Sequence, residues 1–210
     1  MDEYSEKIDR KLFPIIENIN KPMILELGVQ GGISTKKFLN ICDKNNGFLY
    51  SVDIEDCSEV SKEKNWKFIH SRDDNFEYIK SEISKNLDVI YIDSLHEAEH
   101  VEKIIYGYYD LLNLGGYIFI DDISHLPYLK NKKRNSFYCE INNKETFDSI
   151  LKIYSINNSN FDLDFSFKSS GLAIIKKISN NTLNKSKKLK IREFSIKNLI
   201  RKIWKNLKIG

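Results

Sequence analysis

Acidic residues follow three short apolar runs of this sequence, and their placement could support chemistry. Asp53 follows the run at 48–52, Asp93 follows 87–92, and Asp121-Asp122 follow 117–120. Carboxylates that gather without counter-ions repel one another, and a hard divalent cation relieves that repulsion. Oxygen ligands without thiolates favour Mg²⁺ or Mn²⁺ over zinc. We therefore predict a metal site made of Asp93, Asp121 and Asp122.

His96 lies three residues beyond Asp93 and could share that site. A histidine with a pKa near ~6.5 is suited to accept a proton from a substrate hydroxyl. We therefore predict His96 as a general base. The alternative is structural: Asp121 or Asp122 caps a turn, and His96 packs as a satisfied polar residue.

A glycine-rich turn follows the apolar run at 23–27, with the spacing Gly28-x-x-x-Gly32. Glycine lets a backbone turn tightly and approach a ligand, and a helix N-terminus behind it offers N–H groups to an anion. The spacing differs from those of the dinucleotide fingerprint and the P-loop. Asp53, some twenty-five residues later, is placed to bind a ribose diol. A plain strand–helix turn and a solvated strand end are the alternatives.

These residues need an α/β domain to position them, because short apolar runs alternate with amphipathic stretches. The carboxyl ends of parallel strands share one edge of a sheet, where ligands bind. The expected strands are 23–27, 48–52, 66–69, 87–92 and 117–120, followed by an antiparallel hairpin of 161–167 and 172–178. The expected helices are 3–19, one beginning near Ser34, one capped by Asp74, one from Val101 to Leu112 that is stopped by Gly115-Gly116, and 144–156, with a loop at 124–143.

Taken together, the motifs resemble those of class I S-adenosylmethionine-dependent methyltransferases over residues 20–178. Within that class they resemble the metal-dependent O-methyltransferase branch that includes antibiotic-sugar methyltransferases and cephalosporin-hydroxylase-like proteins. The resemblance implies a Rossmann-like, mostly parallel sheet of seven strands whose last strand is antiparallel. The motifs are Glu26-x-Gly28-x-x-x-Gly32-x-Ser34, Asp53, Asp93-x-x-His96, Leu114-Gly115-Gly116 and Asp121-Asp122.

The resemblance also implies a role for each residue that matches. The methionine end of S-adenosylmethionine would contact Glu26, Gly28, Gly32 and Ser34, its ribose Asp53, and its adenine the Ser71-Arg72 segment. Mg²⁺ would bind Asp93, Asp121 and Asp122, with His96 as base. The family often has Glu or His where this chain has Asp121, and His70 replaces its usual glycine after the third strand. The implied reaction is O-methylation of a sugar or another small polyol-like acceptor, in surface-glycan or natural-product biosynthesis.

The charge distribution divides the chain into an acidic body and a basic tail. Residues 185–210 hold ten Lys or Arg and one acid, whereas the other 184 residues hold 23 Lys or Arg and 29 Asp or Glu. We expect an N-terminal helix at 1–22, a catalytic domain at 23–178, a linker at 179–193, and a basic amphipathic helix at 194–210. That helix is typical of a peripheral membrane anchor, and docking on its own domain or on a second subunit is the alternative.

Other features limit the location of the protein and its class. Three cysteines without paired spacing argue against a disulfide framework or a zinc site, so we expect a cytoplasmic protein. The basic tail could bring it into contact with the inner membrane surface. The acidic body argues against nucleic acid as a partner. A homo-oligomer and a non-catalytic adenosyl-binding or scaffold protein stay open. Tyr128-x-x-x-Lys132 has the spacing of nicotinamide-dependent dehydrogenases, but it lies in an expected basic loop and is interpreted as coincidence.

Overall fold

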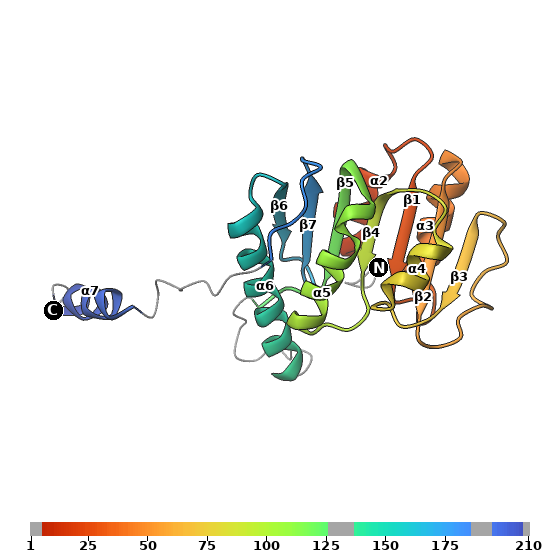
Figure 1. Cartoon of the computed structure of the whole chain (residues 1–210). Coiled ribbons are helices and arrows are strands. Elements are labelled where there is room, and N and C mark those ends of the chain that lie inside the picture. Colours follow the sequence, from red (N-terminus) through yellow and green to blue (C-terminus); the bar gives the residue numbers. More distant parts are fainter. Residues whose placement is uncertain (1–5, 126–136, 186–194, 208–210) are drawn as a thin grey trace.

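The fold is built on one seven-stranded sheet in the order β3-β2-β1-β4-β5-β7-β6 (Figure 1). A computed structural model of the chain describes residues 6–125, 137–185 and 195–207. The strands are β1 (Met23–Leu27), β2 (Phe48–Asp53), β3 (Trp66–His70), β4 (Leu87–Ile92), β5 (Leu112–Asp121), β6 (Phe161–Ser166) and β7 (Leu172–Lys177). Strands β1 to β5 pair in parallel, and β7 is antiparallel to both β5 and β6. The predicted fold, including its antiparallel last strand, is confirmed.

Helices cover both faces of the sheet (Figure 1). On one face, Ile8, Leu12 and Ile16 of the N-terminal segment pack with α3 against β1, β4 and β5. The other face carries α4, α5 and α6. The helices are η1 (Ile8–Leu12, a π-helix), α2 (Phe13–Ile16), α3 (Ile33–Asn45), α4 (Phe76–Glu82), α5 (Ala98–Tyr108), η2 (Tyr109–Leu111, a 3₁₀ turn), α6 (Phe137–Asn157) and α7 (Ile196–Leu207). Because both faces are covered, the central strands are apolar along nearly their whole length.

The connections between strands determine where a ligand can bind. From β1 the chain moves outward through β2 to β3, and then returns to place β4 on the other side of β1. The loops after β1 and β4 therefore diverge at the carboxyl edge, which leaves a crevice between them. Gly28 follows β1 and Asp93 follows β4, so both residues lie at this switch point.

Four predicted boundaries are wrong. The N-terminal helix, predicted to reach residue 19, ends at Ile16. Asp74 does not cap α4, whose N-cap is Asn75; the Asp74 carboxylate pairs with Arg72 and Lys103 instead. Gly115-Gly116 lie inside β5, which begins at Leu112, directly after η2 ends α5. Residues 137–143, expected to be loop, form the first turns of α6. The Tyr128–Lys132 spacing lies outside the described residues.

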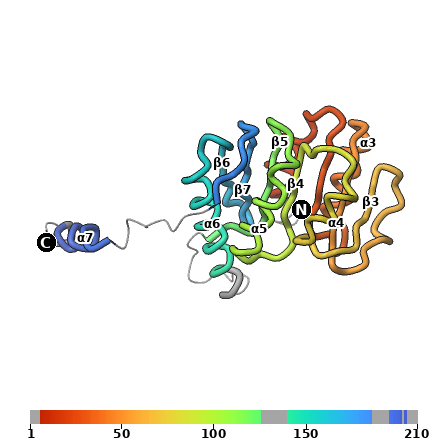
Figure 2. The backbone as a smooth tube through the Cα atoms, viewed as in Figure 1, coloured from red at the N-terminus to blue at the C-terminus, as the bar shows by residue number. Residues whose placement is uncertain are grey.

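The C-terminal helix α7 spans Ile196–Leu207, within the predicted range of 194–210. Figure 2 shows it outside the sheet-and-helix body. Five of its apolar side chains are half or more exposed: Ile196, Leu199, Ile200, Ile203 and Trp204. No helix among the described residues is both long and apolar enough to cross a bilayer.

Candidate active site at the carboxyl edge of the sheet

A cavity of about 910 Å³ opens at the switch point between β1 and β4. Its walls come from the glycine turn after β1, the end of β2, the segment after β3 and the loop after β4. Among the predicted residues, the lining includes Gly28, Ser34, Asp53, Ser71, Arg72, Asp93 and His96. The structure thus brings five of the seven predicted cofactor-binding residues, together with Asp93 and His96, to one cavity. The predicted residues absent from its lining are Glu26, Gly32, Asp121 and Asp122.

Gly28 allows the turn after β1 to pass close to β4. Its φ is +97°, and a Cβ atom there would collide with the carbonyl oxygen of Asp93. Its N–H donates to the Val52 carbonyl at 2.9 Å, while the Asp93 N–H donates to the Leu27 carbonyl at 2.9 Å. Only glycine adopts this conformation without strain, so the close approach of the two loops depends on Gly28.

Gly32 has a different role from the one expected of it. It is the N-cap of α3 at φ +73°, and its Cα faces Val60 rather than the cavity. Ser34, in the first turn of α3, is buried and lines the cavity. The helix N-terminus is therefore presented to the cavity through Ser34, and Gly32 shapes the turn behind it.

Asp53, at the end of β2, holds the glycine turn by hydrogen bonds. Its Oδ2 atom accepts from the Val29 N–H at 2.7 Å and from the Gln30 N–H at 3.0 Å, and its Oδ1 atom accepts from Glu55 N–H at 2.9 Å. Partial burial alone would raise the Asp53 pKa, but these backbone donors lower it. Asp53 is thus ionised at neutral pH, lines the cavity, and keeps capacity to accept a further donor.

Glu26 lies beneath the cavity in the middle of β1 and is fully buried. Its Oε2 atom accepts hydrogen bonds from Thr35 at 2.8 Å and Ser51 at 2.7 Å, and the Ser34 hydroxyl also interacts with the carboxyl group, whereas Oε1 has no hydrogen-bond partner of normal geometry among the described residues. Burial raises its pKa to about 7 despite hydrogen bonds from neighbouring hydroxyls. A buried carboxylate oxygen without a donor is suited to bind an amino group that reaches it from the cavity.

The wall after β3 contains residues that the sequence analysis missed. Asp73 Oδ2 accepts from Ser94 Oγ at 2.5 Å and lies 2.9 Å from His100 Nε2, and all three residues line the cavity. The predicted Arg72 lines it as well and pairs with Asp74 at 3.0 Å. His70 contacts the Ile54 carbonyl and is absent from the lining. The signal that could have found them is position along the chain: Asp73 directly follows the predicted Arg72, and His100 lies in the first turn of the helix that begins just after His96.

The four residues predicted for the catalytic cluster lie together. His96 Nε2 is 3.5 Å from Asp93 Oδ1 and 3.6 Å from Asp122 Oδ2. The Tyr91 hydroxyl lies 3.1 Å from Asp93 Oδ2 and 3.2 Å from Asp121 Oδ2. Burial alone would lower the His96 pKa, but the hydrogen bond that His96 donates to Asp93 and the charges of Asp122, Asp93 and Asp121 raise it.

Asp121 is the most buried member of this cluster. Its Oδ1 atom pairs with the ammonium of Lys7 and accepts the Asp122 N–H at 2.7 Å. Burial and repulsion from Asp93 raise its pKa to about 7, although Lys7 acts in the opposite direction. No pattern in the sequence marks Lys7, which comes from the N-terminal segment 114 residues away.

The donor types in this cluster fit a hard divalent cation. Three carboxylates face one ammonium and one imidazole, so negative charge is in excess. Within the described parts of the chain, however, no three ligating side chains surround a common point as a ready metal site. The carboxylates are instead held by Lys7, Tyr91 and His96. The cluster has the chemistry of a magnesium site in an arrangement closed by protein side chains.

Comparisons with known proteins agree with this geometry. Residues 25–123 match the family model described as a methyltransferase domain. No curated protein sequence matches the chain.

Solved structures share the fold at low sequence identity. MycE methyltransferase from the mycinamycin biosynthetic pathway, in complex with Mg and SAH, is 16% identical with a TM-score of 0.66 over 85% of this chain. This chain covers 53% of MycE, about half its length. A caffeoyl-CoA O-methyltransferase-like protein of Staphylococcus aureus is 20% identical, with a TM-score of 0.61 and 84% of each chain covered. The SAH-bound methyltransferase PaMTH1 of Podospora anserina is 16% identical, with a TM-score of 0.60, covering 83% of this chain and 76% of its own. The chain therefore has the class I methyltransferase fold, and residues 25–123 within it match the methyltransferase domain model.

Proposed function

We propose that the chain is an S-adenosylmethionine-dependent O-methyltransferase, assisted by Mg²⁺, that acts on a hydroxyl of a sugar or another small polyol-like acceptor. One observation carries the proposal: a single cavity joins the glycine turn and Asp53 to Asp93 and His96. The methyl donor and the acceptor hydroxyl could therefore meet in this cavity. The complexes of MycE with Mg and SAH, and with Mg, SAH and mycinamycin VI, support the same combination.

The residues around the cavity provide a binding surface for S-adenosylmethionine. The amino group of its methionine end would approach the unpartnered Oε1 atom of Glu26, beside Gly28 and Ser34. Asp53 would accept hydrogen bonds from the ribose, with Ser71 and Arg72 bordering the adenine. Gly32 contributes by shaping the turn. Bound S-adenosylmethionine supplies an activated methyl group, so the protein's task is alignment of the acceptor oxygen.

His96 is the proposed base. It lines the cavity, and Asp93 and Asp122 hold its Nε2 atom from two sides. An imidazole in this position can take the proton from an acceptor hydroxyl as the oxygen is methylated. A cation held by Asp93, Asp121 and Asp122 would lower the pKa of that hydroxyl. The buried Tyr91 hydroxyl orients Asp93 and Asp121 relative to each other.

A calorimetric titration with S-adenosylhomocysteine, with and without Mg²⁺, tests the donor site. Methyl transfer to a panel of nucleotide sugars and glycans then tests the acceptor class. Binding of S-adenosylhomocysteine without transfer to any acceptor would favour a non-catalytic adenosyl-binding protein. Undiminished transfer by the Asp93→Ala variant after chelator treatment would exclude the metal-assisted reaction.

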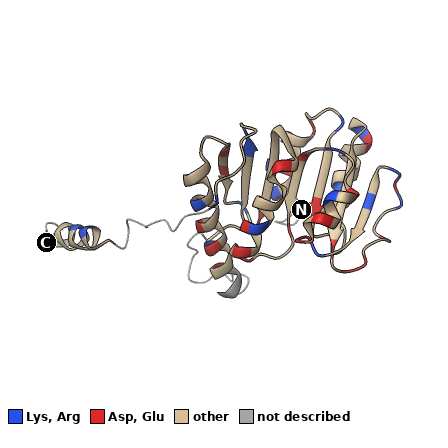
Figure 3. Ribbon diagram, viewed as in Figure 1, with Lys and Arg blue, Asp and Glu red and all other residues tan. Residues whose placement is uncertain are grey.

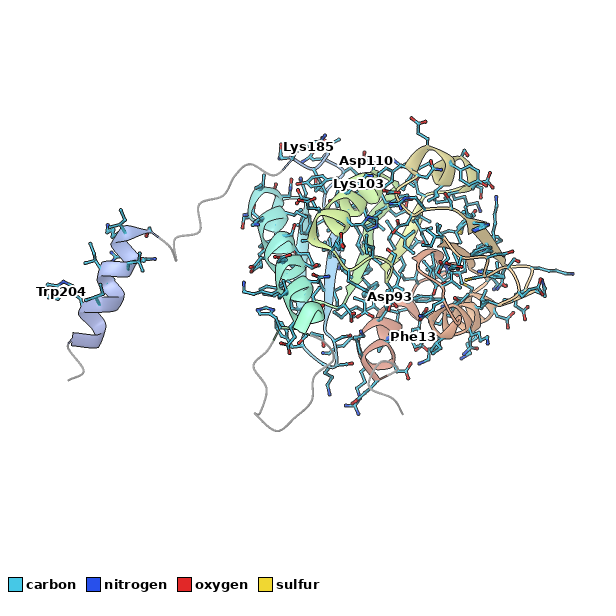
Figure 4. The ribbon with its side chains drawn as sticks, turned by 90° about the horizontal axis from the view of Figure 1, so that it is seen from below. Phe13, Asp93, Lys103, Asp110, Lys185 and Trp204 are labelled. Carbon is cyan, nitrogen blue, oxygen red and sulfur yellow. The ribbon has the colours of Figure 1, made fainter. Side chains whose placement is uncertain are left out.

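We further propose that α7 contacts an anionic membrane surface, which would place the protein in the cytoplasm at the inner membrane. The exposed apolar side chains of α7 lie at three- and four-residue spacings, and Lys197 and Arg201 are exposed on the same helix (Figure 3). A basic helix with exposed Trp and Leu is typical of an interfacial anchor. Figure 4 labels Trp204 on α7 and Asp93 in the body of the fold.

Vesicle sedimentation tests this second proposal. The full chain should sediment with vesicles that contain phosphatidylglycerol, and a chain lacking residues 190–210 should stay in the supernatant. Equal sedimentation of both chains would reject membrane contact. Size-exclusion chromatography of the same two chains separates the alternative, because loss of a dimer on deletion would identify α7 as a subunit contact.

A further inference from the structure

Lys7 is a fully buried lysine, which is rare because an ammonium group loses its hydration on burial. Its Nζ atom pairs with Asp121 Oδ1 and donates a hydrogen bond to Ser170 Oγ at 2.6 Å. Asp121 ends β5, and Ser170 lies in the turn between β6 and β7. One side chain from the N-terminal segment therefore reaches the carboxyl edge of the sheet and neutralises an acid of the catalytic cluster.

Packing of the N-terminal segment holds this ammonium group in place. Ile8 and Leu12, which follow Lys7, are completely buried in the cluster that also contains Tyr91. Before Lys7, Glu6 pairs with Lys168 of the β6–β7 turn at 3.5 Å. Because Lys7 and the residues that follow it are buried together, movement of its ammonium group away from Asp121 would disturb the packing of residues 6–12.

A divalent cation would compete with Lys7 for the same carboxylate, Asp121. Tyr91 bridges Asp121 to Asp93, and the Asp122 N–H donates to Asp121. A cation shared by the three aspartates would therefore stand next to Lys7. Two positive charges within a few ångströms of each other in a buried site repel strongly, since little solvent screens them.

We propose that Lys7 and a divalent cation bind Asp121 in mutually exclusive states, so that cation loading releases the start of the N-terminal segment from the carboxyl edge of β5. Lys7 is then an internal counter-ion that offsets part of the negative charge of the acid cluster while no metal is bound. This inference rests on the proposed function in one respect, because it takes Asp121 as a ligand of the cation.

Direct binding of Mn²⁺, followed by electron paramagnetic resonance without any methyl donor, tests the exclusion. Lys7→Met keeps the length of the side chain and removes its charge. We expect it to bind Mn²⁺ at least about tenfold more tightly than the unaltered chain, because the competing charge is gone. The control is Lys37→Met, which removes an ammonium that pairs with Asp9 at 2.6 Å in a partly exposed site; its affinity should stay unchanged. Equal or weaker binding by Lys7→Met, or no Mn²⁺ binding by any variant, would overturn the proposal.

Hydrogen exchange of the unaltered chain gives a second measurement that does not depend on a variant folding. Amides of residues 6–16 should exchange faster at Mn²⁺ concentrations that fill the site, since release of Lys7 loosens that segment. Unchanged or slower exchange there would overturn the proposal. S-adenosylhomocysteine titrated into the same preparation reports separately on the methyl-donor site, so failure of the proposed function is distinguishable from failure of the exclusion.

Discussion

Ser51 donates its hydroxyl proton to Glu26 Oε2 over 2.7 Å, and both side chains are completely buried. The two residues face each other on adjacent strands, since Glu26 of β1 is in register with Ser51 of β2. Thr35 of α3 donates a second hydrogen bond to Glu26 Oε2, and the indole N–H of Trp66 donates to Ser51 Oγ at 3.0 Å. A carboxyl group is thus built into the core of the sheet, two residues before Gly28 of the cavity lining.

This arrangement predicts that Glu26 makes the stability of the protein depend on pH. Burial raises the Glu26 pKa from 4.5 to about 7. The folded state therefore binds the proton more tightly than the unfolded state, and stability falls as the pH rises through this interval. We expect Glu26→Gln to gain about 2–3 kcal/mol relative to the unaltered chain between pH 4.5 and pH 8.

Urea unfolding of both chains at several pH values measures that difference. Comparing the two chains at each pH removes the contribution of Asp121, which titrates in the same range. A difference in unfolding free energy that stays constant with pH would show that folding does not raise the pKa of Glu26. The same variant should bind S-adenosylhomocysteine more weakly, because the carboxylate proposed to receive the amino group is lost.

The two glycines of the turn should differ in their tolerance of a methyl group. Gly28→Ala places a Cβ against the Asp93 carbonyl at a φ of +97°, so we expect a loss of about 2 kcal/mol or more in stability. Gly31→Ala meets nothing within 4 Å and should change stability by less than about 0.5 kcal/mol. Thermal unfolding of both variants checks this, and equal effects would contradict the role given to Gly28.

Much of this site could be predicted because the strands are continuous apolar runs that end in polar residues. Met23–Leu27 and Leu87–Ile92 are buried on both faces, so the sequence shows where they end and that Gly28 and Asp93 follow them. Parallel pairing then places Gly28, Asp53 and Asp93 at one edge. The antiparallel hairpin was predictable from two alternating segments separated by a short turn with a glycine.

The remaining features depend on tertiary contacts that no local pattern encodes. Gly115-Gly116 is a common helix stop, but here Gly116 lies against the Asp88 carbonyl within β5. Lys7 precedes an ordinary amphipathic stretch, and only the packing of Ile8 and Leu12 turns its side chain inward. Asp73 and His100 belong to different elements, so their pairing appears only when α5 packs beside the segment after β3.

Asp53 is predicted to act both on the glycine turn and on the cofactor. Asp53→Asn replaces one carboxylate oxygen by an NH₂ group. A donor then faces either the N–H groups of Val29 and Gln30 or that of Glu55, and the hydrogen bonds on that side are lost. We expect about 1–2 kcal/mol lower stability and at least about tenfold weaker binding of S-adenosylhomocysteine. The control is Asp56→Asn, an exposed aspartate that accepts hydrogen bonds from the nearby Ser58, including its N–H at 3.0 Å, and that does not line the cavity. Calorimetry on both variants measures the affinities, and unchanged affinity in Asp53→Asn would limit Asp53 to a structural role.

His96 should affect turnover without affecting the binding of the donor. His96→Gln keeps a polar side chain but removes the base, so we expect kcat to fall by about 100-fold or more while S-adenosylhomocysteine affinity stays within about twofold. The matched control is His70→Gln, because His70 is exposed, contacts the Ile54 carbonyl and does not line the cavity. Single-turnover methyl transfer with a saturating acceptor separates chemistry from product release. Full activity in His96→Gln would remove the base from the proposed reaction and would leave alignment of the acceptor as the main contribution of the protein.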